Sequence, residues 1–356
     1  MKPDIDIYAV EEDLQRGKAD LDSLFALGDM YFSQGRHLDL LDLCNRMTTM
    51  PLTKLDLATV LSYKGVTHVC LSHWEAATAA FLQSLDALEH APENMEEVVS
   101  LKGMNYYDLS LYCQDVDKAD DYGELALKYL TILSRSFPDY PHMSKVFAHI
   151  ADLHHSMGDL DQALVYYGLF YEASVETEDK VWAMTGMATV YGFLGQTDKA
   201  LEMYNDALQV ADSKALMSKV YYDLGEMHYR LENFYESRSS LETALKFRDQ
   251  DPVLMQNEEY EVSILWRLGT IAFDLEEEEE MAPLFEKVLG MINSTHSYYA
   301  DINLRMGHYY LGLCRYATAS GYYNEVLLTP AASAEETLIA KDCLAGIPLK
   351  KPTLLH

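Results

Sequence analysis

The sequence has few positive charges for its length. Its 356 residues include 27 Lys and Arg against 57 Asp and Glu, which gives a formal net charge of −30 at pH 7. A surface with this charge repels the phosphates of nucleic acids and the anionic headgroups of membranes. We therefore expect neither nucleic acid nor a membrane as the main partner, and a basic protein segment fits the charge better.

Long apolar runs and paired cysteines are also missing. No stretch of about 18 apolar residues occurs, so no membrane span is expected, and the opening segment MKPDIDIYAVEEDLQ lacks the apolar core of a secretory signal. An odd number of cysteines without a CxxC pair predicts unpaired, mostly buried thiols in a reducing compartment. The five are Cys44, Cys70, Cys113, Cys314 and Cys343. These features predict a cytoplasmic protein without a structural zinc ion.

Motifs of enzyme active sites are absent as well. The sequence has no glycine-rich phosphate loop, no nucleophile elbow and no pair of acids in a pocket context. We expect a non-enzymatic protein, with no catalytic residue, no metal and no cofactor.

What the sequence does contain is an internal repeat, clearest in VWAMTGMATVYGFLGQTDKALEMYNDALQVAD, which starts at Val181. Offsets 7–8, 11, 15, 20, 24 and 27 of this segment hold Met187-Ala188, Tyr191, Gly195, Ala200, Tyr204 and Ala207. These are the offsets at which the tetratricopeptide repeat has a large–small pair, an aromatic, a turn, a small residue, an aromatic and a small residue, so the segment resembles that family. Small residues at offsets 8 and 20 let the two helices of a hairpin approach closely.

The same frame recurs along the chain. It opens near residues 21, 58, 100, 144, 181, 218, 262 and 300, at spacings of 37 to 44 residues. The copy from Ser100 is degenerate, because it has Tyr107 where Gly or Ala is usual, although it keeps Ala119 and Ala126. The resemblance implies an all-α fold, a right-handed superhelical solenoid of about eight helical hairpins.

This frame divides the chain into three parts. Residues 1–20 are an N-terminal extension, and residues 21–329 are the repeat array. Residues 330–356 are predicted to be a capping helix and tail, because Ser333 and Glu336 stand at the spacing of a capping box.

The resemblance also implies where a ligand binds, since the family lines its concave groove with the first helix of each hairpin, at offsets 2, 5, 6, 9, 12 and 13. Carried over to this chain, these offsets predict a peptide- or protein-binding site that comprises Asp108, His149, Asp152, His155, Trp182, Tyr222, Glu226, Tyr229, Trp266 and Arg267. Acids recur at offset 9 among aromatics, which suits an extended segment with Lys or Arg. In an alternative interpretation, several of the aromatics belong to the packed seam between hairpins.

The cluster HIADLHHSMGD raises the question of a metal site. His149 and His155 do not have the i, i+4 spacing of a metal-binding helix. His154 takes the same repeat position as His68 and His228, which indicates a core histidine.

The run Glu276–Glu280 falls where other copies have the turn between helices, and Pro283 is expected in the first turn of the next helix. A solvated acidic bend is the favoured interpretation, and a docking strip for a basic partner is the other. A calcium loop is not expected, because the alternating Asp or Asn ligands and the central Gly are missing.

We therefore expect an adaptor or assembly scaffold that binds a protein or extended peptide in an acidic, aromatic groove. One alternative is a peptide-sensing regulator whose solenoid changes pitch when a ligand binds. A second alternative is a structural scaffold that associates with itself, so a homo-oligomer is possible.

Overall fold

The computed structural model describes residues 10, 12, 14, 19–113, 115–330 and 332–347. Within these residues the chain is all-α, with 17 α-helices, one short 3-10 helix and no β-strand. The chain divides into two compact units, a first unit Met1–Ser174 and a second unit Val175–His356. None of the helices in the described ranges is both long and apolar enough to span a bilayer.

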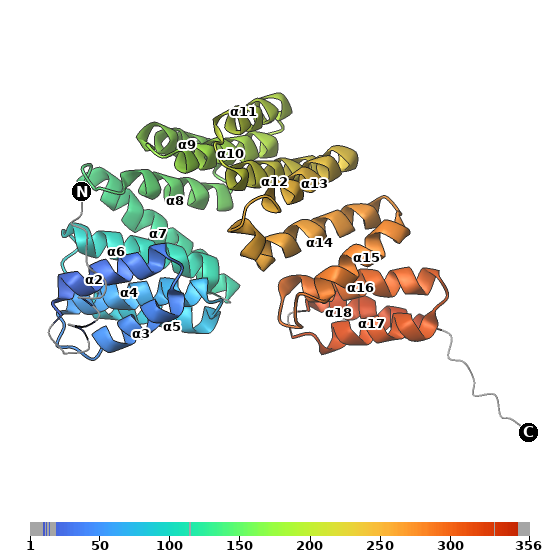
Figure 1. Ribbon diagram of the computed structural model, residues 1–356, viewed down its shortest axis with the longest axis horizontal. Coiled ribbons are helices and arrows are strands. Elements are labelled where there is room, and N and C mark those ends of the chain that lie inside the picture. Colours follow the sequence, from blue (N-terminus) through green and yellow to red (C-terminus); the bar gives the residue numbers. More distant parts are fainter. Residues whose placement is uncertain are drawn as a thin grey trace, which may run out of the picture. The chain divides into compact units, whose positions relative to one another are not determined.

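The first unit consists of four helical hairpins (Figure 1). Their helices are α2 (Leu21–Ser33) and α3 (His37–Met47), α4 (Lys54–Cys70) and α5 (Trp74–Ala87), α6 (Glu96–Tyr112) and α7 (Val116–Ser136), and α8 (Met143–Ser156) and α9 (Leu160–Ala173). We call the first helix of each hairpin its A helix and the second its B helix.

The second unit contains four more hairpins and a final helix. The hairpins are α10 (Thr177–Phe193) and α11 (Thr197–Val210), α12 (Lys214–Arg230) and α13 (Phe234–Arg248), α14 (Glu258–Asp274) and α15 (Glu278–Leu289), and α16 (Ser297–Gly312) and α17 (Tyr316–Leu328). A 3-10 helix, η1 (Leu254–Gln256), precedes α14, and the last helix is α18 (Ala334–Gly346). The prediction of a helical repeat array is thus confirmed.

In most hairpins, a glycine of the A helix packs against a large side chain of the B helix. A Cβ at Gly65 would lie 2.4 Å from the Phe81 ring, and one at Gly307 would lie 2.5 Å from the Tyr323 ring. The rings of Phe81 and Tyr323 are fully buried, so they have little room to move. This close approach explains the small residue that the repeat has at offset 8.

The turn between A and B helices contains a residue with positive φ in seven hairpins. It is glycine at three of them and a residue with a side chain at Ser72, Glu232, Glu276 and Cys314. The following N–H bonds a carbonyl five residues back, as in His73 N to His68 O at 2.8 Å, which caps the A helix. The histidines at offset 11 therefore stand at the last turn of their helices.

The third hairpin is longer than the others. Its close contact joins Gly103 to Leu130, where a Cβ would lie 2.8 Å from Leu130 Cδ2. The frame that opens at Ser100 places Tyr107 at this contact, so the structure puts the contact about one turn earlier on the A helix. Tyr107 lies one turn farther along α6, and its hydroxyl donates to Asp152 of α8.

Both helices of this hairpin contribute to the extra length, as a comparison with the second hairpin shows. Measured from the glycine of the close contact, α6 runs about one turn farther than α4 before it ends at Tyr112. The B helices are compared by counting back from the residue that meets the glycine, Leu130 in α7 and Phe81 in α5. Counted in this way, α7 begins about two turns earlier than α5 does, at Val116. We call residues 107–112 and 116–124 the third-hairpin extension.

The capping helix was correctly predicted, since Ser333 and Glu336 form a capping box at the start of α18. The predicted tail at residues 348–356 lies outside the described residues, as does most of the predicted extension 1–20. Val10 and Leu14 of that extension are described and pack against the core of the first hairpin.

The glutamate run is shared between a turn and a helix. Glu276 and Glu277 are in the turn, and α15 begins at Glu278, so Pro283 lies in its second turn rather than the expected first. Arg238 of α13 forms ion pairs with Glu277 and, at 3.2 Å, with Glu280. Part of the run is thus neutralised within the chain.

All five cysteines are free, as predicted. The expectation that most are buried was wrong, because only Cys44 is buried, while Cys70 and Cys314 are exposed. Cys314 is exposed because it occupies the positive-φ position of a surface turn.

Candidate functional site

The ten predicted groove residues fall on A helices of both units. Asp108, on α6, and His149, Asp152 and His155, on α8, belong to the first unit. Trp182, on α10, Tyr222, Glu226 and Tyr229, on α12, and Trp266 and Arg267, on α14, belong to the second.

In the first unit, tyrosine hydroxyls hold two carboxylates of the A helices, those of Asp29 and Asp152. Asp152 accepts hydrogen bonds from Tyr107 at 3.0 Å and Tyr167 at 2.6 Å. Asp29 accepts one from Tyr63 at 2.5 Å. Burial raises the pKa of Asp152, and the two tyrosine hydrogen bonds oppose this rise. Neutral donors fix the position of a carboxylate without cancelling its charge.

His149 and Asp108 are two further A-helix residues in the first unit. The His149 ring lies over the Tyr107 ring, with centroids 4.0 Å apart, and burial lowers the pKa of His149 to about 4, so the ring is neutral at pH 7. Burial raises the pKa of Asp108 to about 7. His155 is half-buried on α8, and the described residues contain no group of His, Cys, Asp or Glu able to hold a metal ion.

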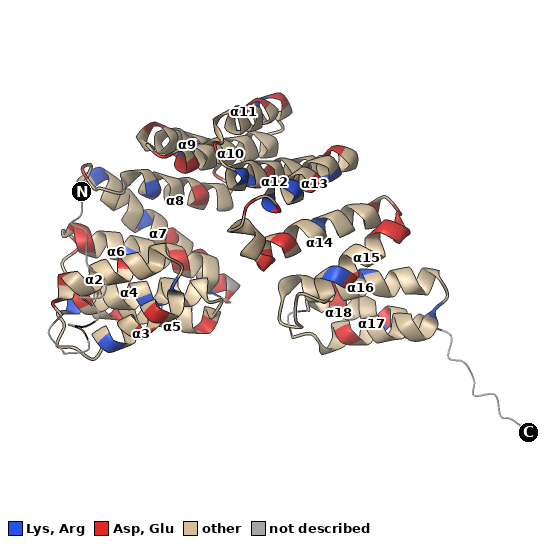
Figure 2. Cartoon of the chain, viewed as in Figure 1, with Lys and Arg blue, Asp and Glu red and all other residues tan. Residues whose placement is uncertain are grey.

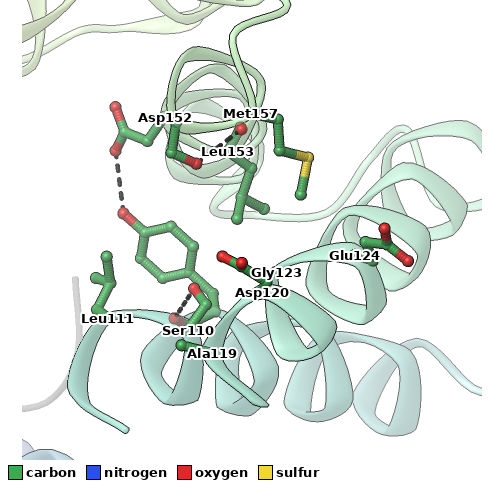
Figure 3. Close-up of a pocket in the computed structure, with 11 residues that line it drawn as sticks. Ser110, Leu111, Ala119, Asp120, Gly123, Glu124, Asp152, Leu153 and Met157 are labelled. Atoms are coloured by element: carbon green, nitrogen blue, oxygen red, sulfur yellow. Dashed lines mark hydrogen bonds between the residues drawn. The ribbon is translucent and has the colours of Figure 1, made fainter. Parts of the chain in front are cut away.

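A pocket of about 470 Å³ lies between the third-hairpin extension and the C-terminal end of α8 (Figure 3). Its lining combines three carboxylates, Asp120, Glu124 and Asp152, with the apolar side chains of Leu111 and Met157. Asp152 is the one predicted groove residue in it. Sequence reasoning missed the others, because the extension was not recognised.

In the second unit, a cation pairs with the equivalent acid. Arg267 Nε and Nη2 donate to the two carboxylate oxygens of Glu226 at 2.6 and 2.7 Å. The guanidinium also lies over the rings of Tyr229, at 4.1 Å, and Trp266, at 4.6 Å. Four predicted residues thus form one cluster across α12 and α14.

The cluster continues along α14 and α16. The Trp266 ring stacks on Tyr298 with centroids 4.1 Å apart, and its Nε1 donates to Asp301 at 2.9 Å. Arg305 pairs with Asp301 at 2.8 Å and with Asp274 at 3.8 Å. Asp301 and Asp274 stand at offsets 2 and 13 of their frames, so the groove offsets alone could have identified both.

Trp182 and Tyr222 make further contacts on α10 and α12, and Tyr222 lies near enough to Glu226 for that carboxylate to help raise the pKa of Tyr222. Trp182 is 37% exposed and lines a small pocket of about 150 Å³ with Lys219 and Asp223. Burial, with a smaller effect of Glu226, raises the pKa of Asp223 to about 7. Tyr222 packs edge-on against Tyr260. Tyr222, Tyr229 and Trp266 thus each contact a residue of the next hairpin.

Solved structures of two repeat proteins share this fold. A chain of the APC/C hetero-tetramer Cut9–Hcn1 is 16% identical, with a TM-score of 0.52; the match covers 91% of this chain and 56% of that one. A monomeric mutant of IFIT1 with Gppp-AAAA is 15% identical, with a TM-score of 0.58; the match covers 94% and 75%. This chain thus spans just over half the length of the first. No curated protein matches the sequence significantly.

The family comparison agrees with the fold. Residues 142–213, which include α8 to α11, match the family described as tetratricopeptide repeat. This match assigns tetratricopeptide repeats to residues 142–213. Tetratricopeptide-repeat proteins are generally non-enzymatic scaffolds that bind proteins or peptides.

Proposed function

We propose that this protein is an adaptor or assembly scaffold that binds an extended protein segment with basic residues along its A helices. The observation that supports this function is the way neutral tyrosine hydroxyls hold Asp152 and Asp29. A carboxylate positioned in advance by a neutral donor keeps its negative charge, and it can accept a Lys or Arg of the partner without first being reoriented.

Aromatic rings beside these carboxylates support the same ligand. Phe32 is 44% exposed and lines a groove of about 400 Å³ with Asp29 and Tyr63. A basic side chain in such a groove gains cation–π contacts as well as charge-assisted hydrogen bonds.

Negatively charged partners fit this chain poorly. Asp and Glu outnumber Lys and Arg in each unit and appear along the helices of both (Figure 2). The IFIT1 structure holds Gppp-AAAA, but for this chain we propose no nucleic-acid partner. A capped RNA of that sequence should therefore show no binding at about 150 mM salt.

The test is capture of partners from the source lysate, followed by calorimetry on each purified partner. The bait is the full chain, compared with Asp29→Asn/Asp152→Asn and with the control Asp86→Asn/Asp121→Asn, which changes exposed acids on B helices. We expect the groove pair to weaken binding at least tenfold and the control pair less than twofold. Raising the salt should slow association.

A partner that binds both double variants equally would contradict the proposed site. A partner that changes the radius of gyration of the chain would favour the peptide-sensing alternative. A dimer in sedimentation without any partner would favour the self-associating scaffold.

A further inference from the structure

The third-hairpin extension forms one wall of the 470 Å³ pocket in the first unit. Ala119 and Asp120 come from the two added turns of α7, and Gly123 and Glu124 come from the turn that follows them. The opposite wall is the end of α8. In Figure 3, the Asp120 carboxylate points into the space between α7 and α8.

The polar side chains of the pocket offer only hydrogen-bond acceptors to a ligand inside it. The Tyr107 hydroxyl donates to Asp152, the Ser110 hydroxyl donates to the Tyr107 carbonyl at 2.6 Å, and the Ser156 hydroxyl donates to the Leu153 carbonyl at 2.9 Å. Each hydroxyl has therefore committed its proton and offers only lone pairs. The three carboxylates add only acceptors, and no Lys or Arg of the described chain lines the pocket.

The remaining surface of the pocket is apolar. Leu111 is 54% exposed and Met157 is 44% exposed, and both lie at the pocket beside the buried Leu153. Exposing two such side chains to water is unfavourable, and an aliphatic ligand would cover them. A suitable ligand is thus an aliphatic chain that ends in hydrogen-bond donors and carries positive charge.

We propose that this pocket binds a single lysine or arginine side chain of a partner protein, with the aliphatic stem on Leu111 and Met157 and the cation near Asp120 and Asp152. Lys and Arg have only donors at their charged ends, which complements the all-acceptor lining. The inference rests on the proposed function for the source of the side chain, and it adds a position that selects for a basic residue.

The test uses the full chain and a blocked pentapeptide, acetyl-Gly-Gly-Lys-Gly-Gly-amide. Methyl-labelled methionine NMR reports binding through the Met157 methyl signal, assigned with Met157→Leu. Matched peptides carry Arg, Gln or norleucine in place of Lys. The site variant is Asp120→Asn/Glu124→Gln, and the control is Asp117→Asn/Asp121→Asn, which removes two charges from the same turns of α7 outside the pocket.

We expect the Lys and Arg peptides to shift the Met157 signal with millimolar affinity, and the Gln and norleucine peptides to leave it unchanged. The site variant should weaken binding at least fivefold at about 150 mM salt, and the control less than twofold. Equal shifts with norleucine, equal loss in the control, or no shift with Lys at about 10 mM would each overturn the proposal.

The pocket proposal and the proposed function can fail independently, and the two experiments distinguish these outcomes. If the probe binds but lysate capture finds no basic partner, the pocket stands and the adaptor function fails. If a basic partner binds through Asp29 and Asp152 while the probe does not bind, the groove stands and the pocket proposal fails.

Discussion

The two units have nearly the same charge but arrange it differently. The first unit has 28 Asp and Glu against 12 Lys and Arg, and the second has 29 against 15. On the A helices of the first unit, Asp29 and Asp152 are held by tyrosines, whereas on those of the second unit Glu226 and Asp301 are held by arginines. These two acids of the first unit thus accept from tyrosine hydroxyls, and the two of the second unit pair with arginines, although Asp274 of the second unit also accepts from the Tyr229 hydroxyl at 2.8 Å.

This difference leads us to propose that the basic partner suggested above binds the first unit. A carboxylate held by a hydroxyl retains its net charge, but one paired with a guanidinium attracts a second cation weakly. The cluster of α12, α14 and α16 is better described as a seam that joins successive A helices.

The largest effect should come from breaking the Glu226–Arg267 pair. Arg267→Met leaves a mostly buried carboxylate without its cation, and we expect a loss of about 2 to 3 kcal/mol in the free energy of unfolding. Urea denaturation measures it. The double variant Arg267→Met/Glu226→Gln should recover much of the loss, and equal destabilisation of single and double variants would show that Arg267 acts through packing alone.

The next prediction concerns acids whose pKa is raised by burial, with Asp108 in the first unit and Asp223 in the second. Its pKa rises from 3.8 to about 7 through burial, so the folded chain binds this proton more tightly than the unfolded chain. The stability it contributes is complete below pH 3.8 and is lost as the pH rises through about 7.

Asp108→Asn should therefore stabilise the chain by about 2 kcal/mol at pH 8 and have little effect at pH 4. Urea denaturation at both pH values gives the comparison. Asp223→Asn in the second unit is the matched variant, and it should gain a similar amount because burial and Glu226 raise the pKa of Asp223 to about 7 as well. No gain at Asp223 at pH 8 would contradict this interpretation.

Removing one tyrosine hydroxyl tests the neutral donors of the first unit. Tyr107→Phe deletes one of two hydrogen bonds to Asp152, and we expect a loss of about 1 kcal/mol at pH 7. The pKa of Asp152 should rise further, which NMR titration of the carboxyl carbon would detect. An unchanged pKa would mean that the hydroxyl does not stabilise the charge.

The smallest effect concerns the residue with positive φ in the turn of each hairpin. This residue is Glu276, with a φ of 59°, in one turn of the second unit, and Gly158, with a φ of 78°, in one turn of the first. Glu276→Gly should stabilise the chain by about 0.5 to 1 kcal/mol, and Gly158→Ala should destabilise it by a similar amount, both measured by urea denaturation. A loss of stability in Glu276→Gly would indicate that its carboxylate forms a contact worth more than the backbone strain.

The sequence predicted the hairpins well because each rests on local spacing. Gly65 and Phe81 have the same separation along the chain as Gly307 and Tyr323, so one motif identifies both helices of a hairpin. Ser333 and Glu336 likewise specified the start of α18 through a short local motif.

The extension of the third hairpin escaped prediction because its extra residues preserve the helical pattern. Ala119 and Ala126 are one heptad apart and lie on nearly the same face of α7, so either fits the small-residue position. Only the contact of Gly103 with Leu130 distinguishes the two registers. The pocket beside the extension was therefore invisible in the sequence.

The partners of the A-helix acids were equally beyond the sequence. Glu226 and Arg267 are 41 residues apart, and Tyr107 and Asp152 are 45 apart. Whether a tyrosine or an arginine reaches a given carboxylate depends on how successive hairpins stack, which the repeat frame alone does not specify.

The length of the third hairpin also bears on how the chain folds. Its closing contact, between Gly103 and Leu130, spans a longer stretch of chain than the contact between Gly65 and Phe81 does in the second hairpin. Closing the longer segment costs about 0.5 kcal/mol more chain entropy. Folding of the array should therefore nucleate at a shorter hairpin and reach the third by propagation from its neighbours.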